Sequence, residues 1–338
     1  MIDSRAEISP IVMTETRPAK AWKSVVLHAL VAVFLFLSGG FVVTAPLALF
    51  VPVTFMSVGL RFGNRAALAS SAIFLGLFAV LTSLLSAGGS TSRELSVLFS
   101  ILLAIVIPSL VATALVRRET PAGRVLILGL ASSAVSFAVA ELLGRVLLSV
   151  SPFVALVESF RQAGALTIEI YRQAGVKATA LEGMTRVSEL VTRDFLPLLL
   201  AFGVILSLAL SIAAIPRIPA GRATGERYLF RFFSLPDWTL IVFIVGGLSP
   251  LASGTLRVAG FNLLGAVIVL YALQGMAILR YGMMRNGVGP IGTTLIFVLA
   301  SILAPYTATV FFLAGLFDPF FDFRKLNRKE ESNESDLD

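Results

Sequence analysis

The residues best suited to chemistry are few, because almost no ionisable side chain lies inside the long apolar segments of the chain. Glu141 and Arg145 are the clearest exception. They are four residues apart in the apolar segment 125–150, so on a helix they share one face and can form an ion pair. An ionisable residue inside a membrane is a functional candidate. Two interpretations fit: a self-neutralising pair near the membrane surface, or a charged contact in an outward-facing cavity.

A second set of candidates lies in the apolar segment 259–281. Asn262 is near its start, and Tyr271 and Gln274 lie one helical turn apart further along. Such groups either line a polar cavity or hydrogen bond to neighbouring helices. Together with Glu141 and Arg145 they form the predicted substrate-binding set. No catalytic residue is predicted.

Small residues recur at helical spacing in two apolar segments, and such rows allow helices to approach closely. The positions are Ser132, Ser136, Ala140 and Gly144 in the first segment, and Gly203, Ser207 and Ser211 in the second. Two interpretations remain open: helix packing within the protein, or a docking face for a partner membrane protein.

The sequence lacks the residues that several kinds of active site require. The chain has no cysteine and one histidine, which excludes thiolate and multi-histidine metal or haem sites. The sequence contains no phosphate-binding P-loop, no Gly-x-Ser-x-Gly elbow and no His-Glu-x-x-His motif. We therefore expect no enzymatic activity, no cofactor and no metal, and we expect any ATP hydrolysis to require another protein.

The composition indicates that these candidates lie in a membrane. Apolar residues make up 57% of the 338 residues and charged residues 14%, whereas soluble domains have about 45–50% and about 25%. The mean hydropathy is +0.91. The net charge of +7 does not indicate nucleic acid, because the basic residues cluster between apolar runs, as in cytoplasmic loops. A polytopic membrane protein is expected, with the lipid bilayer as its surroundings.

The apolar segments predict an all-α transmembrane bundle with eight or nine spans, because most of them approach the roughly 20 residues that a bilayer requires. Their approximate limits are 24–38, 41–60, 66–86, 95–116, 125–150, 195–215, 238–256, 259–281 and 290–316. The second segment, with Pro46 and Pro52, and the last, with Pro305, are the ones expected to be interrupted. The predicted transmembrane domain is 24–316, between an N-terminal tail, 1–23, and a polar C-terminal tail, 317–338.

Loop charges predict the orientation. If the N-terminal tail is cytoplasmic, the arginine-rich loops near 61–65, 117–124 and 217–231 are cytoplasmic too. Segment 151–194 is then extracytoplasmic. It is nearly neutral and amphipathic, and its sequence FRQAG at 160–164 recurs as YRQAG at 171–175. It is predicted to be either an interfacial helix pair or a lid over a cavity between the helices.

Motifs in the C-terminal third carry a resemblance to a known family, and a proline-containing second segment followed by Leu60-Arg61-Phe62-Gly63 adds to it. The C-terminal motifs are Asn262, Leu273-Gln274-Gly275, Gly315, Asp318 and Phe321-Asp322-Phe323-Arg324-Lys325. With these features the chain resembles the YybS-like family of predicted bacterial membrane proteins, whose function is unknown. The first helices of that family are similar to the substrate-binding S components of energy-coupling-factor transporters.

The resemblance implies a protein of the bacterial cytoplasmic membrane that binds a small solute. A separate coupling subunit and ATPase would then be its partners, and no nucleic acid is expected. The alternative is a non-transporting scaffold or assembly factor that holds partner proteins through the small-residue faces. A buried polar pocket under segment 151–194 would favour the first function, whereas a bundle filled with apolar side chains would favour the second.

Overall fold

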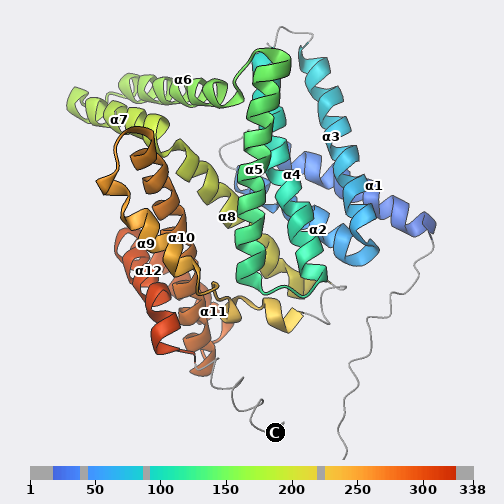
Figure 1. Cartoon of the computed structure of the whole chain (residues 1–338), viewed down its shortest axis with the longest axis vertical. Helices are drawn as coiled ribbons and strands as arrows, with labels where there is room; N and C mark the ends of the chain where they lie inside the picture. Colours follow the sequence, from blue (N-terminus) through green and yellow to red (C-terminus); the bar gives the residue numbers. More distant parts are fainter. Residues whose placement is uncertain (1–17, 39–44, 87–91, 219–224, 325–338) are drawn as a thin grey trace, which may run out of the picture.

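The computed structural model describes residues 18–38, 45–86, 92–218 and 225–324, and the regular secondary structure in these ranges is entirely helical (Figure 1). The α-helices are α1 (Pro18–Ser38), α2 (Val51–Phe62), α3 (Asn64–Ser86), α4 (Ser92–Arg117), α5 (Ala122–Leu148), α6 (Pro152–Gln173), α7 (Ala178–Leu190), α8 (Leu196–Ala214), α9 (Thr239–Gly247), α10 (Gly254–Arg285), α11 (Pro290–Ile302) and α12 (Ala304–Phe321). Short 3-10 or π turns are η1 (Ala45–Phe50), η2 (Val191–Phe195), η3 (Ile215–Arg217), η5 (Gly225–Tyr228), η6 (Phe230–Phe232) and η7 (Ser249–Leu251).

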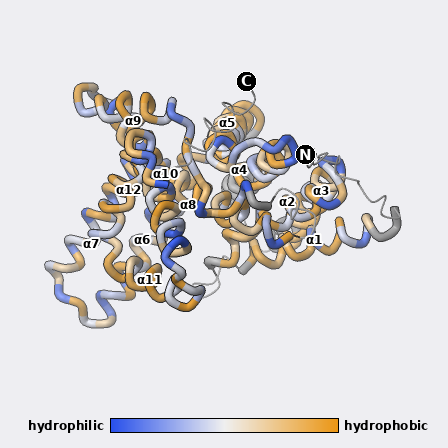
Figure 2. The backbone as a smooth tube through the Cα atoms, turned by 90° about the horizontal axis from the view of Figure 1, so that it is seen from below, coloured by the Kyte–Doolittle hydropathy of each residue, from blue (hydrophilic) through white to orange (hydrophobic). Residues whose placement is uncertain are grey.

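Helix α8 lies between two groups of helices (Figures 1 and 2). On one side it contacts α2 and α5, which pack with α1, α3 and α4; on the other it contacts α10, which packs against α9 and α12. One hydrophobic core crosses this boundary, from Met56 of α2 through Leu208 of α8 to Leu270 of α10. The two groups are therefore joined by continuous apolar packing.

Proline and glycine determine where several helices begin and end. Pro52 stands in the first turn of α2, directly after the 3-10 turn η1, and Gly63 ends that helix at a φ of 94°. The chain bends by 111° between α11 and α12, next to Pro305. Proline has no backbone N–H to continue a helix, so the chain bends there. The interruptions expected in the second and the last apolar segments are confirmed.

Four helical stretches of the described residues are long and apolar enough to cross a bilayer, and the bent pair α11–α12 would be a fifth. They are Asn64–Leu81, Ala122–Leu147, Ala178–Arg217 and Gly254–Arg285. The eight or nine spans expected from the sequence are not supported. In four other places the apolar stretch among the described residues is only 10–17 residues long, whereas a membrane-spanning helix needs about 20. These stretches are Ala21–Leu37, Leu47–Phe62, Leu103–Arg117 and Thr239–Leu251.

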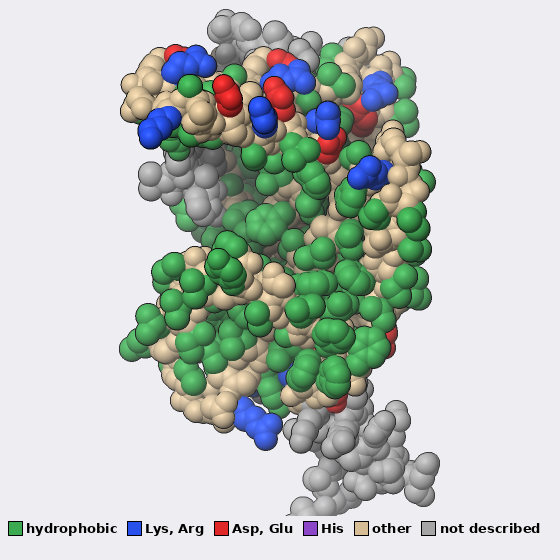
Figure 3. Space-filling model, turned by 90° about the vertical axis from the view of Figure 1, so that its left-hand side faces the viewer, with side chains coloured by type: hydrophobic (Ala, Val, Ile, Leu, Met, Phe, Trp, Pro, Cys, Tyr) green, Lys and Arg blue, Asp and Glu red, His purple; other side chains and the backbone are tan. Residues whose placement is uncertain are grey.

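The outer surface has the charge distribution of a membrane protein. In Figure 3 the charged side chains gather over α6 and α7 at one end, and hydrophobic side chains dominate the face below them. Large apolar side chains stand far out of the packed interior: Leu147 is 72% exposed and Ile291 is 87% exposed. Contiguous apolar surface of this kind is rare on soluble monomers. It fits a surface covered by lipid.

The sequence repeat in segment 151–194 produces the same local arrangement twice on α6. Arg161 pairs with Glu158, and Arg172 pairs with Glu169, each three residues apart. The following glutamine of each copy also donates to the same glutamate. Helix α6 packs against α7, so the predicted helix pair is present at one end of the molecule (Figure 1). The extracytoplasmic position predicted for it is not supported by the structure.

Candidate functional site

Gln274 lies at the centre of a buried polar network on α10. Its side chain is 1% exposed. The backbone N–H of Leu235 donates to its Oε1 over 2.9 Å, and its Nε2 donates to Asp318 Oδ2 over 3.0 Å. One amide thus joins α10 to α12 and to the segment before α9. A buried amide must pair both ends to avoid a desolvation cost, and Gln274 does so within the protein.

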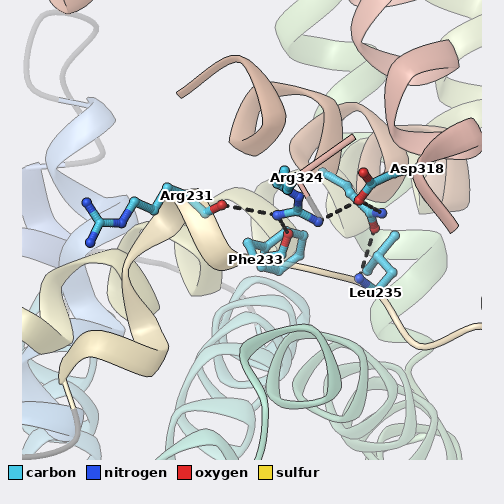
Figure 4. Close-up of polar contacts among 6 residues, drawn as sticks. Arg231, Phe233, Leu235, Asp318 and Arg324 are labelled. Atoms are coloured by element: carbon cyan, nitrogen blue, oxygen red, sulfur yellow. Dashed lines mark hydrogen bonds and ion pairs between the residues drawn. The ribbon is translucent and has the colours of Figure 1, made fainter. Parts of the chain in front are cut away.

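A buried ion pair extends this network to the end of α12 (Figure 4). Arg324 Nη2 donates to Asp318 Oδ2 over 2.6 Å, and both side chains are less than 10% exposed. Arg324 Nη1 donates to the carbonyls of Phe233 and Arg231, over 2.8 and 3.1 Å. The network therefore fixes the C-terminal end of α12 on the segment 231–235. Asp318 Oδ1 and Arg324 Nε are buried and have no hydrogen-bond partner among the described residues.

Two glycines allow α12 to reach α10. A Cβ at Gly275 would lie 1.9 Å from the Phe311 carbonyl oxygen, and a Cβ at Gly315 would lie 1.9 Å from that of Tyr271. The backbones are in contact at this crossing, as in small-residue contacts between membrane helices. The close approach brings Asp318 within reach of Gln274.

Tyr271 and Asn262 hold α10 to its other neighbours. The hydroxyls of Tyr271 and Thr239 are 3.0 Å apart, which links α10 to α9. Asn262 repairs a break near Pro197: its Oδ1 accepts from Leu198 N–H and its Nδ2 donates to the Asp194 carbonyl, over 2.8 and 2.7 Å. These two backbone groups would bond to each other in a continuous α-helix, but a π turn precedes this position.

Glu141 serves as an anchor for the start of α6. Its Oε1 accepts from Ser151 Oγ over 2.5 Å, and its Oε2 accepts from Phe153 N–H over 2.8 Å. Arg145 also donates to Oε1, over 2.6 Å, but its side chain is 63% exposed whereas that of Glu141 is 18% exposed. The predicted i, i+4 pair exists. The carboxylate supports the N-terminus of α6, where backbone N–H groups lack helical acceptors.

We expect an asymmetric response at this pair. Glu141→Ala removes the acceptor for a hydroxyl and a backbone N–H and should cost about 1–3 kcal/mol of stability. Arg145→Ala should cost well under ~1 kcal/mol, because it removes one side of an exposed ion pair. Thermal unfolding in lipid nanodiscs measures both. Equal losses for the two variants would show that the charge pair, rather than the anchoring of α6, carries the stability.

The small residues lie mostly in internal packing. Ser136, Ala140 and Gly144 of α5 are buried, and Gly144 touches Pro152 at the start of α6. Ser132 is partly buried and donates to its own helix. On α8, Ser207 donates to the Leu49 carbonyl over 2.6 Å, and Ser211 donates to Ser207. These positions fit packing within the protein.

Gly203 differs from the other small residues, because a Cβ there would meet no atom within 4 Å. It lines a cavity of about 580 Å³ between η1, α2, α4, α5, α6 and α8. Phe137 of α5 and Phe153 and Phe160 of α6 form part of the wall. The hydroxyl of Ser133 also lines the cavity, but it donates to the Ala104 carbonyl over 2.9 Å. The lining side chains are thus apolar or already hydrogen bonded.

Tyr228 holds residues 225–231 of the arginine-rich loop against the turn between α4 and α5. Its hydroxyl donates to the Thr120 carbonyl over 2.8 Å, and burial raises its pKa to about 12. The phenol therefore stays protonated and keeps this bond at neutral pH. The nearby Arg227 pairs with Glu119 over 3.1 Å. These contacts fix the segment before α9 on the turn between α4 and α5.

Comparison with known proteins gives one family. A family model described as a predicted membrane protein (DUF2232) matches residues 29–319. The chain belongs to the DUF2232 family. No curated protein and no solved structure matches the chain. The DUF2232 match contains the whole cavity lining together with Gln274 and Asp318, whereas Arg324 lies just beyond its end.

The predicted polar residues and the apolar cavity differ in their ability to bind a ligand. The five residues predicted to bind substrate do not converge. Glu141 and Arg145 lie near the end of α5, next to the start of α6, and Asn262, Tyr271 and Gln274 contact different neighbours of α10. Among the described residues no group of three metal-ligating side chains occurs. The cavity provides the space for a ligand. Sequence reasoning missed its lining in this DUF2232 protein, because apolar side chains have no chemical signature.

Proposed function

We propose that this protein is a transporter-like membrane component that binds a small apolar solute in the cavity beside α8. The observation that carries this function is the cavity itself, whose volume of about 580 Å³ falls within the roughly 300–1,000 Å³ typical of ligand sites. A membrane location for the chain is supported by the family and by its apolar helices.

The lining favours an apolar solute over a charged one. No charged residue of the described ranges lines the cavity, and burying an unpaired charge is costly. The hydroxyls of Ser133 and Ser207 already donate to backbone carbonyls. The solute class that fits is therefore a terpenoid or an alkyl chain. This cavity is therefore not the buried polar pocket expected from the sequence for a solute-binding component.

In this proposal helix α6 covers the cavity. It contributes Phe153 and Phe160 to the cavity, and Glu141 holds its first turn in place. This supports the lid interpretation of segment 151–194. The role of Glu141 is then to position helix α6, and the solute itself contacts apolar side chains.

The finer assignments rest on sequence. The resemblance to YybS-like proteins and to S components supports the role of a solute-binding component in the bacterial cytoplasmic membrane. Because the printed sequence has no P-loop, energy for transport would come from a separate ATPase and coupling subunit. The arginine-rich loops support a cytoplasmic N-terminus with α6 and α7 on the opposite side.

A substitution that fills the cavity tests this function. In Gly203→Leu the new side chain enters open space, so we expect unchanged or higher thermal stability, since leucine also favours helix more than glycine does. Binding of farnesol, an apolar terpenoid alcohol, should fall at least tenfold. Binding is measured by native mass spectrometry from lipid nanodiscs, because detergent would compete for an apolar cavity.

Gly76→Leu on α3 is the matched control. A Cβ at Gly76 also meets no atom within 4 Å, but Gly76 does not line the cavity. It should bind farnesol as the native protein does. The proposal fails if the native protein binds neither farnesol nor an alkyl chain of similar size, or if Gly203→Leu folds and binds them unchanged.

A further inference from the structure

A second hollow lies on the other side of α8, at the arginine-rich end of the molecule. It is a groove of about 570 Å³ between α8, η6, α10 and the start of α11. Its inner wall is apolar and includes Leu206 and Leu210 of α8 and Leu273 of α10. Three arginines also line it: Arg217, Arg231 and Arg280. Among the described residues no acidic side chain is part of its lining.

None of the three arginines has a carboxylate partner among the described residues. Arg217 donates to the Ala213 carbonyl over 2.7 Å, and Arg280 donates to Thr293 Oγ1 over 2.5 Å. Arg231 Nη1 contacts Met284 Sδ over 3.3 Å, and its Nε is buried with no hydrogen-bond partner among the described residues. None of the three takes part in an ion pair within the described ranges. The groove therefore combines positive charge with free donors.

The first turn of α11 adds to the positive electrostatic potential of the groove. Pro290, Thr293 and Thr294 line the groove, so the N-terminal end of a helix of 13 residues opens there. Backbone dipoles give that end a partial positive charge that favours anions. Arginine suits phosphate in particular, because its planar group offers several donors at once.

We propose that this groove binds an anionic phospholipid, with the headgroup phosphate between Arg217, Arg231 and Arg280 and an acyl chain along the apolar wall. A phosphate anion is the chemistry that the arginines recognise. The adjoining wall of leucines favours a phosphate that carries an acyl chain over a free one. Basic pockets between membrane helices bind anionic headgroups in this manner.

The groove lies next to the polar network, because Arg231 belongs to both. The side chain of Arg231 points away from Arg324 toward the groove, whereas its backbone carbonyl accepts from Arg324 (Figure 4). A phosphate bound to the Arg231 side chain would therefore be held by the same residue whose backbone carbonyl helps to fix the end of α12. Among the described residues the groove shares no lining residue with the apolar cavity, so this proposal does not depend on the proposed function.

The test measures retained lipid on the full chain. The protein is placed in phosphatidylcholine nanodiscs containing phosphatidylglycerol, and native mass spectrometry counts the phosphatidylglycerol that survives delipidation. We expect one tightly held molecule. The triple variant Arg217→Gln, Arg231→Gln and Arg280→Gln should bind it on the order of 100-fold more weakly, from about 1 kcal/mol for each basic residue near an anionic surface.

A matched triple variant controls for general surface charge. Arg61, Arg65 and Arg118 are exposed and do not line the groove, so their replacement by glutamine should leave the tight lipid in place. An equal loss in this control overturns the proposal. Inorganic phosphate or glycerol phosphate that displaces the lipid at equal concentration would also overturn it, because the site would then recognise a free anion.

A second variant covers the case in which the arginine variant does not fold. Ala213→Phe keeps all three arginines but places a ring against the apolar wall of the groove. We expect a folded protein, by size-exclusion chromatography, that loses the tight phosphatidylglycerol at least tenfold. The proposal is overturned if this variant folds and retains the lipid.

Discussion

Gly275→Ala and Gly315→Ala are each expected to destabilise the protein strongly, by about 3 kcal/mol. Each added Cβ would lie 1.9 Å from a backbone carbonyl oxygen of the facing helix. A backbone atom cannot rotate away as a flexible side chain can, so α10 and α12 must separate. Overpacking in a tight core costs about 1–3 kcal/mol, and occasionally more. Chemical or thermal unfolding in nanodiscs, followed by circular dichroism, measures the loss.

Gly282→Ala provides the control on the same helix. A Cβ at Gly282 meets no atom within 4 Å, so this variant should be neutral or gain up to about 1 kcal/mol from helix propensity. If Gly275→Ala and Gly282→Ala unfold at the same temperature as the native protein, α10 and α12 do not cross at backbone contact.

The buried pair Asp318–Arg324 should show the largest effect of any charged residue in the described ranges. Asp318→Ala leaves the Arg324 guanidinium without its carboxylate in a place where it is 1% exposed. Removing one partner of a buried pair costs roughly 3–5 kcal/mol. The double variant Asp318→Leu with Arg324→Met removes both charges and should recover much of this loss. The free energy of unfolding of the single and double variants decides this.

The exposed pair Arg227–Glu119 is the matched comparison, because its two side chains are 67% and 48% exposed. Arg227→Ala should cost less than ~1 kcal/mol. If Asp318→Ala costs no more than Arg227→Ala, the network is open to water. If the double variant is less stable than both single variants, the charges themselves are needed to hold α12 in place.

The sequence alone determined that the protein lies in a membrane and that its secondary structure is helical. Its apolar runs have no strand alternation, and in a bilayer the backbone must form its hydrogen bonds within the segment. The same patterns marked Gln274 and Asn262, because polar side chains within an apolar helix need partners. They also marked the interruptions at Pro52 and Pro305, since proline breaks a helix wherever the rest of the chain lies.

The tertiary structure decided which partners those residues have and how far the helices reach. Gln274 bonds to Leu235 and Asp318, which are 39 and 44 residues away in sequence. Glu141 anchors α6, although its spacing indicated a pair with Arg145. Both hollows lie between helices that are distant in the sequence, and side chains of ordinary type line them. Spacing along one helix fixes which side chains share a face, but only the packing of helices against each other creates a cavity or brings together charges from separate loops.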